Sequence, residues 1–132
     1  MKQLVLVAIL ICSAIKLMAT GGYDIAICDS INKKGLCAGK SDFFHYTGDR
    51  MRLQAVVYNK DMLGTPKIYF KLYLMSNDNE GEIVAELHTD VHPGWFAVVK
   101  RLYFFKPGYY KLDVFNAKGT KLGTQFVTIS DR

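Results

Sequence analysis

Residues 107–129 read PGYYKLDVFNAKGTKLGTQFVTI, and this stretch predicts a β-hairpin. Two runs rich in β-branched and aromatic residues flank a turn at residues 116–119, where Gly119 suits a backbone with positive φ. The residues of the first run alternate, with Tyr110, Leu112 and Val114 between Tyr109, Lys111 and Asp113. A period of two is typical of a strand with one buried face and one face toward water.

The chain after residue 22 reads as a succession of short strands separated by polar turns. The expected strands before the hairpin cover residues 23–28, 43–46, 51–57, 67–75, 82–87 and 95–104. In the last of these, the neighbours Lys100 and Arg101 place one charge on each face, which predicts a bulge or a switch between sheets. Seven to eight strands at this spacing predict an all-β fold. We expect a two-sheet antiparallel sandwich with immunoglobulin-like topology, and a small closed barrel is the alternative.

The N-terminus has the order of a secretory signal peptide. Lys2 gives a positive start, residues 4–15 carry no charge, and small residues follow. This uncharged run is shorter than the roughly 20 residues that a membrane-spanning helix needs. We therefore expect residues 1–19 to form a signal helix that is cleaved, which leaves 20–132 as a single exported domain, periplasmic or extracellular.

Other processing of the N-terminus stays open: cleavage after Ala14, an uncleaved anchor, or lipidation of Cys12. Membrane contact is expected only through an uncleaved or lipidated N-terminus. The chain carries a formal charge of +5, which falls to +3 when residues 1–19 are removed. This charge is too small to indicate a nucleic-acid-binding protein, so no nucleic-acid partner is expected.

Two cysteines, Cys28 and Cys37, remain after the expected cleavage. In an oxidising compartment, two cysteines at this spacing on a hairpin-like segment predict a disulfide bond. Closing so short a loop stabilises the fold by about 2–3 kcal/mol on the chain-entropy account.

The C-terminal half resembles the closing strands of bacterial immunoglobulin-like envelope modules. The resemblance rests on GEIVAEL from Gly81, on Trp95, on PGYYKLDVFNAKG from Pro107 and on FVTI from Phe126. In particular, residues 50–130 are similar to a family of short exported β-sandwich domains of unknown function. Where that family has a His and a Trp, this chain has Tyr69 and Phe70. The resemblance implies an immunoglobulin-like fold and an exported location, and it brings no catalytic residues.

No residue pattern indicates catalysis, so we expect neither an enzyme nor a cofactor. No serine lies in a Gly-x-Ser-x-Gly motif, and the carboxylates are scattered over turns and polar faces. His88 and His92 have the spacing of a helical metal pair, but Pro93 argues against a helix there. Together with His45, and with or without the cysteines, they define the alternative function, a metal-binding envelope protein.

A surface pattern remains after these exclusions. If Ile68, Phe70, Leu72 and Leu74 face the core, the outward row of that strand is Tyr69, Lys71, Tyr73 and Met75. Aromatic rows interleaved with lysines suit a glycan, a peptide or a partner sheet. The candidates for partner binding are Tyr69, Lys71, Tyr73, Tyr109 and Lys111. The sequence therefore predicts a small, non-catalytic binding or structural module of the cell envelope. It would engage a protein or glycan through this face or through an exposed edge strand.

Overall fold

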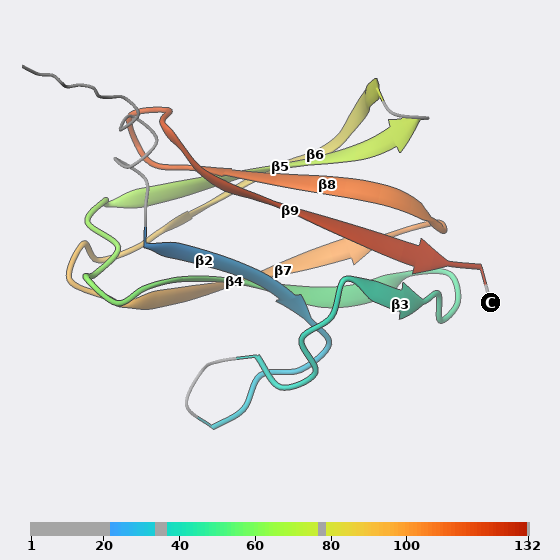
Figure 1. The fold of residues 1–132 in the computed structure, drawn as a ribbon, viewed down its shortest axis with the longest axis horizontal. Coiled ribbons are helices and arrows are strands. Elements are labelled where there is room, and N and C mark those ends of the chain that lie inside the picture. The colour runs from blue at the N-terminus through green and yellow to red at the C-terminus, as the bar shows by residue number, and fades with distance from the viewer. Residues whose placement is uncertain (1–21, 34–36, 77–78, 132) are drawn as a thin grey trace, which may run out of the picture.

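Alternating apolar residues fold the chain into short strands, as the computed structural model shows (Figure 1). The structure describes residues 22–33, 37–76 and 79–131, so the expected signal segment and Cys12 lie outside the described residues. The described strands are β2 (Tyr23–Cys28), β3 (Phe43–His45), β4 (Met51–Asn59), β5 (Lys67–Ser76), β6 (Asn79–Asp90), β7 (Ala97–Phe104), β8 (Gly108–Phe115) and β9 (Lys121–Ser130). No helix in this part of the chain has the length and apolar character to cross a bilayer.

The strands form two facing sheets (Figure 1). A three-stranded sheet has the order β2-β4-β7, and a five-stranded sheet has the order β3-β9-β8-β5-β6. All neighbours are antiparallel except β3 and β9, which run parallel. The order β9-β8-β5-β6 matches strands G, F, C and C′ of an immunoglobulin domain, and β2-β4-β7 matches A, B and E. The predicted immunoglobulin-like sandwich is confirmed, and the closed-barrel alternative is wrong.

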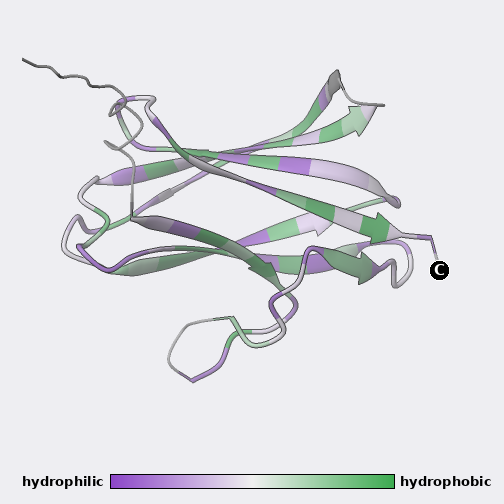
Figure 2. Ribbon diagram, viewed as in Figure 1, coloured by the Kyte–Doolittle hydropathy of each residue, from purple (hydrophilic) through white to green (hydrophobic). Residues whose placement is uncertain are grey.

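The core lies between the sheets, as the period of two in the sequence predicts. From β5 and β8 the inward side chains are Ile68, Phe70, Leu72, Tyr110, Leu112 and Val114, all buried. They face buried residues of the three-stranded sheet, such as Leu53 on β4 and Leu102 on β7. The colours in Figure 2 alternate along these strands, because successive side chains point to opposite faces.

The bulge or switch between sheets expected at Lys100 and Arg101 is not present in strand β7. Its pairing with β4 runs from Met51↔Phe104 to Tyr58↔Ala97 without a register shift, so it is not bulged and does not leave its sheet. The charges of Lys100 and Arg101 on opposite faces have another cause. Strand β7 is the last strand of its sheet, and Lys100 is partly exposed at this open edge, where an inward-pointing charge can reach water, whereas Leu102 and Phe104 on the same face are buried.

Two local predictions are confirmed. Gly119 has a φ of +85° in the turn between β8 and β9, where a side chain would strain the backbone. Cys28 and Cys37 form a disulfide bond with a Cα–Cα distance of 5.7 Å. Cys28 is fully buried at the end of β2, and Cys37 and Lys40 line a hollow with outward residues of β2 and β4. The disulfide therefore fastens this loop to the three-stranded sheet.

The connection from β7 to β8 contains a tyrosine corner, a hallmark of immunoglobulin-like sandwiches. The Tyr110 hydroxyl donates a hydrogen bond of 2.7 Å to the Lys106 carbonyl. The Tyr110 ring meets the Phe104 ring edge-on, with centroids 4.9 Å apart. Burial raises the pKa of Tyr110, and the nearby Tyr46 raises it further.

We expect Tyr110→Phe to lower the free energy of unfolding by about 1 kcal/mol near neutral pH, because one hydrogen bond is lost. Since the native pKa of Tyr110 is raised, its contribution is complete below the unfolded pKa, near 10, and is lost as pH rises through the native value. Urea unfolding at neutral and alkaline pH should show the gap between wild type and variant shrinking as pH rises. A gap that grows would contradict this assignment. The exposed Tyr109→Phe is the control.

Candidate partner-binding surfaces

Five residues expected at a binding surface lie on two neighbouring strands of the five-stranded sheet. Strand register pairs Tyr69 with Phe115, Lys71 with Asp113, and Tyr73 with Lys111. Residues directly opposite in an antiparallel pair share a face, so these side chains lie on the side of the sheet away from the core. We call this surface the aromatic–basic face. It consists of Tyr69, Lys71, Tyr73, Tyr109, Lys111, Phe115 and Phe126.

Lysine–ring contacts hold part of the aromatic–basic face in place. The Lys71 ammonium lies 5.3 Å from the centroid of Phe115, and the Lys111 ammonium lies 4.8 Å from that of Tyr73. Such a contact contributes about 0.5–1 kcal/mol at exposed sites and about 2 kcal/mol where the cation is desolvated. Each contact joins β5 to β8, so the rings and cations have a defined arrangement before any partner arrives.

Phe126 on β9 belongs to the same face, although sequence reasoning did not select it. Its ring stacks on Tyr109 with centroids 5.6 Å apart and an interplanar angle of 9°. The two side chains are 41% and 45% exposed, which leaves much of this ring pair open to water. The signal was present in the sequence, since Val127 and Ile129 are inward residues of β9 and Phe126 alternates with them.

Asp113 departs from the expectation of a solvent-facing position, because its side chain is covered and the residue is only 3% exposed. The Thr124 hydroxyl donates a 2.6 Å hydrogen bond to Asp113 Oδ1. The ammonium groups of Lys111 and Lys121 lie 3.6 and 3.5 Å from Asp113 Oδ2. These partners satisfy the buried carboxylate and fix Lys111 between Asp113 and Tyr73.

Replacing Asp113 by asparagine should lower the free energy of unfolding by about 2 kcal/mol, because the amide cannot neutralise the mostly buried Lys111. Chemical denaturation of both proteins measures the difference. Asp90→Asn is the matched control. Asp90 also pairs with a lysine, but its side chain is 83% exposed, so the change should stay within about 0.5 kcal/mol. Equal effects of the two substitutions would contradict a structural role for burial of Asp113.

The three histidines do not come together, so the three-histidine metal site proposed from the sequence is wrong. His45 is on β3 and His88 on β6, at opposite edges of the five-stranded sheet. Four strand spacings separate them, roughly 19 Å. The His88 ring packs near Tyr69, and the His92 ring near Trp95. Among the described residues, no group of three or more His, Cys, Asp or Glu side chains could hold a metal ion.

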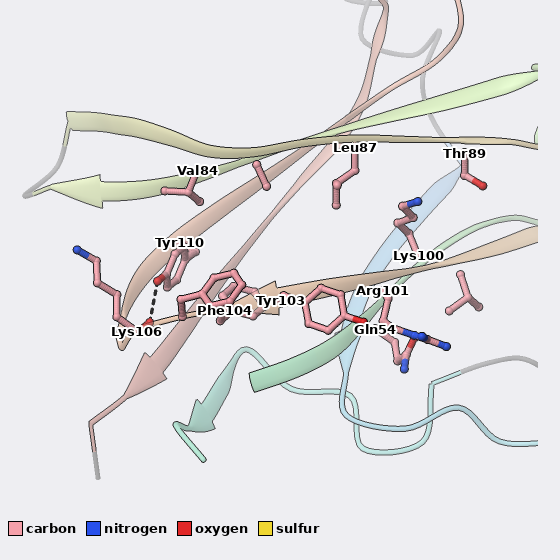
Figure 3. Close-up of a pocket in the computed structure, with 13 residues that line it drawn as sticks. Gln54, Val84, Leu87, Thr89, Lys100, Arg101, Tyr103, Phe104, Lys106 and Tyr110 are labelled. Atoms are coloured by element: carbon pink, nitrogen blue, oxygen red, sulfur yellow. Dashed lines mark hydrogen bonds between the residues drawn. The ribbon is translucent and has the colours of Figure 1, made fainter. Parts of the chain in front are cut away.

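A second surface lies along one side of the sandwich, between β6 and β7 (Figure 3). We call it the side groove, a hollow of about 750 Å³. Val84, Leu87 and Thr89 of β6 face residues of β7 across it. The complete lining is Gln54, Val84, Ala85, Leu87, Thr89, Val99, Lys100, Arg101, Tyr103, Phe104, Phe105, Lys106 and Tyr110. Sequence reasoning considered an edge strand but did not find this hollow, since only the fold brings β6 and β7 to the same side.

Arginine side chains cluster around Tyr103 at the rim of the side groove. A side-chain hydrogen bond with Arg101 lowers the pKa of Tyr103, and the positive charges of Arg101, Arg50 and Arg52 lower it further. The Arg50 guanidinium also lies over the Tyr103 ring, 4.7 Å from its centroid. This end of β7 is therefore a positively charged, solvent-facing edge.

Fold and surfaces together define a class, a small immunoglobulin-like β-sandwich domain with exposed aromatic and basic surfaces. No family model matches the chain, and no curated protein matches it. Among solved structures, it is similar to an immunoglobulin-like protein from Pseudomonas aeruginosa, at 15% identity over 83% of this chain and 93% of that one, with a TM-score of 0.48. It is also similar to the CARDB domain of a Pyrococcus furiosus protein in complex with di-metal ions, at 13% identity over 81% and 93% of the two chains, with a TM-score of 0.43. At these scores the likeness carries no argument about function.

Proposed function

We propose that this protein is a small exported, non-catalytic binding module of the cell envelope, and that it engages a protein partner through the aromatic–basic face. The observation that carries the proposal is the ordered set of rings and lysines on the outer face of β5, β8 and β9, of which Tyr69, Tyr109 and Phe126 are exposed. Rings that are fixed before binding lose little conformational entropy in a complex. Aromatic anchors of this kind often supply most of the binding energy at protein interfaces.

The charges on the face favour a protein over a polyanionic glycan. Lys111 and Lys121 already lie beside the Asp113 carboxylate, which offsets part of their positive charge. A polyanion gains most from unneutralised cations, whereas a protein partner gains most from burial of the rings. The aromatic–basic face therefore suits a protein with a moderately polar docking patch.

The test is a triple variant in which Tyr69, Tyr73 and Tyr109 become serine. Affinity purification from the exporting host with quantitative mass spectrometry should show at least one partner falling about 10-fold relative to wild type. The control is Trp95→Ser, at an exposed ring away from the face, with unfolding midpoints compared for all proteins. A partner profile that the triple variant leaves unchanged rejects the proposed face. A captured ligand released by glycosidases but not by proteases rejects the protein partner.

Export is supported by the N-terminal residue pattern and by the disulfide bond, which is typical of oxidising compartments. We expect the intact mass of protein from the exporting host to match residues 20–132 less two hydrogens. A mass that retains residues 1–19 would contradict cleavage, and an added lipid mass would indicate an acylated N-terminus. The same measurement after reduction and alkylation counts the disulfide.

A further inference from the structure

The side groove lies where two sheet edges open on the same side of the sandwich (Figure 3). In the described part of the chain, β6 pairs only with β5, and β7 pairs only with β4. Edge strands carry unpaired backbone N–H and C=O groups, which can pair with an added strand. Both edges border a hollow of about 750 Å³, within the size range of ligand sites.

The two edges differ in regularity. Strand β6 has register shifts against β5 between Leu72 and Tyr73 and again between Leu74 and Ser76. Such irregularities discourage the addition of a strand. Strand β7 pairs with β4 over its whole length without a shift, so its free edge is a regular template of eight residues. The unshifted edge is therefore the better acceptor for an added strand.

The groove combines an apolar floor with a basic rim. Leu87, Phe104 and Tyr110 are apolar groups in its lining, and Phe105 beside them is 69% exposed. Lys100, Arg101 and Lys106 supply the only charges among the lining residues, and all are positive. None of these three forms an ion pair with another described residue. Charge complementarity therefore calls for a ligand with carboxylates among apolar side chains.

We propose that the side groove binds an extended peptide segment with a central acidic pair flanked by alternating apolar residues, which adds to β7 as an antiparallel strand. The two peptide residues directly opposite Lys100 and Arg101 lie on the same faces of the sheet as these cations. Acidic side chains therefore suit both peptide positions. Residues opposite Val98 and Leu102 share the inward face of β7 with Phe104, which lines the groove, so apolar side chains suit these positions. The site is separate from the aromatic–basic face and does not depend on it.

The basic pair also argues against a second copy of the chain as the occupant. Antiparallel pairing of two β7 edges in this register would set Lys100 and Arg101 against the same residues of the other copy. Like charges directly opposite each other destabilise a strand pair. The same charges that repel a copy attract an acidic segment, which gives specificity as well as affinity.

Fluorescence anisotropy with synthetic octapeptides tests the proposal. VTLEETVS carries the expected pattern, and VTLKKTVS reverses its charges. We expect the acidic peptide to bind the disulfide-bonded protein with an anisotropy signal that saturates by about 1 mM. The lysine peptide should bind at least 10-fold more weakly. The acidic peptide with alternate amides N-methylated on its pairing edge should lose binding, because strand addition needs these donors.

Charge-reversal variants make the test independent of folding defects. The double variant Lys100→Glu with Arg101→Glu should weaken the acidic peptide at least 10-fold and should bind the lysine peptide better than wild type does. Lys71→Glu, on the aromatic–basic face, is the matched control and should leave peptide binding unchanged. The triple tyrosine variant should also leave peptide binding unchanged. This result would distinguish peptide binding in the side groove from partner binding at the aromatic–basic face. Absence of saturable binding, equal binding of the two peptides, or no change in the double variant would overturn the proposal.

Discussion

Replacing Phe70 by alanine is expected to lower the free energy of unfolding by about 4 kcal/mol. Phe70 lies on β5, points into the core between the sheets and is 1% exposed. Its removal costs the transfer energy of the ring and also leaves a cavity that neighbouring strands cannot close, because each is fixed by its own pairing. Since small domains are stable by only about 5–15 kcal/mol, the variant should be close to unfolding at physiological temperature.

Urea denaturation followed by Trp95 fluorescence and circular dichroism measures this difference. The matched control is Phe43→Ala on the short edge strand β3, where the side chain is half exposed and the change should be within about 0.5 kcal/mol. Similar effects at Phe70 and Phe43 would mean that the two sheets do not enclose a common core.

Replacing both Cys28 and Cys37 by serine is expected to lower the free energy of unfolding by about 3 kcal/mol. The disulfide closes a loop between residues nine positions apart and so restricts the unfolded chain. When the cross-link is removed, the unfolded chain gains conformational entropy and becomes more favourable. Cys28 is also fully buried, so a serine hydroxyl there adds the cost of burying a polar group.

Thermal unfolding measures this second prediction, and reducing the wild type should reproduce most of the effect without any substitution. For a domain of this size, a loss of about 3 kcal/mol corresponds to a fall of roughly 10 °C in the unfolding midpoint. The single variant Cys37→Ser should show most of this fall, since it also opens the loop but places no serine hydroxyl at the buried position 28. An unchanged midpoint in all three cases would contradict a stabilising role for the bond.

The fold could be predicted where the residue pattern alone determines which side of a strand is buried. Ile68, Phe70 and Leu72 alternate strictly with polar or aromatic residues, and a shift of one position would expose all three, so their inward direction followed from the sequence. Lys100 and Arg101 could not be interpreted in this way. Their placement depends on β7 being an edge strand, and strand order is set by contacts between residues distant in the sequence.

The candidate surfaces show the same division. The five outward residues of β5 and β8 could be selected because each strand keeps its own period, and the structure then pairs the strands. Burial of Asp113 could not be predicted, because Thr124 and Lys121, which cover it, come from the neighbouring strand β9. The side groove forms only because β6 of one sheet lies opposite β7 of the other. No local sequence pattern predicts that arrangement.

The most direct test of the central claim is NMR cross-saturation from a captured partner to the isotopically labelled protein. If the aromatic–basic face is the docking surface, the ring signals of Tyr69, Tyr73 and Tyr109 should lose intensity on irradiation of the partner. Signals from residues on the outer side of β2 and β4 should keep their intensity. Intensity losses confined to β2, β4 or the disulfide loop, with the three tyrosines unaffected, would contradict the account.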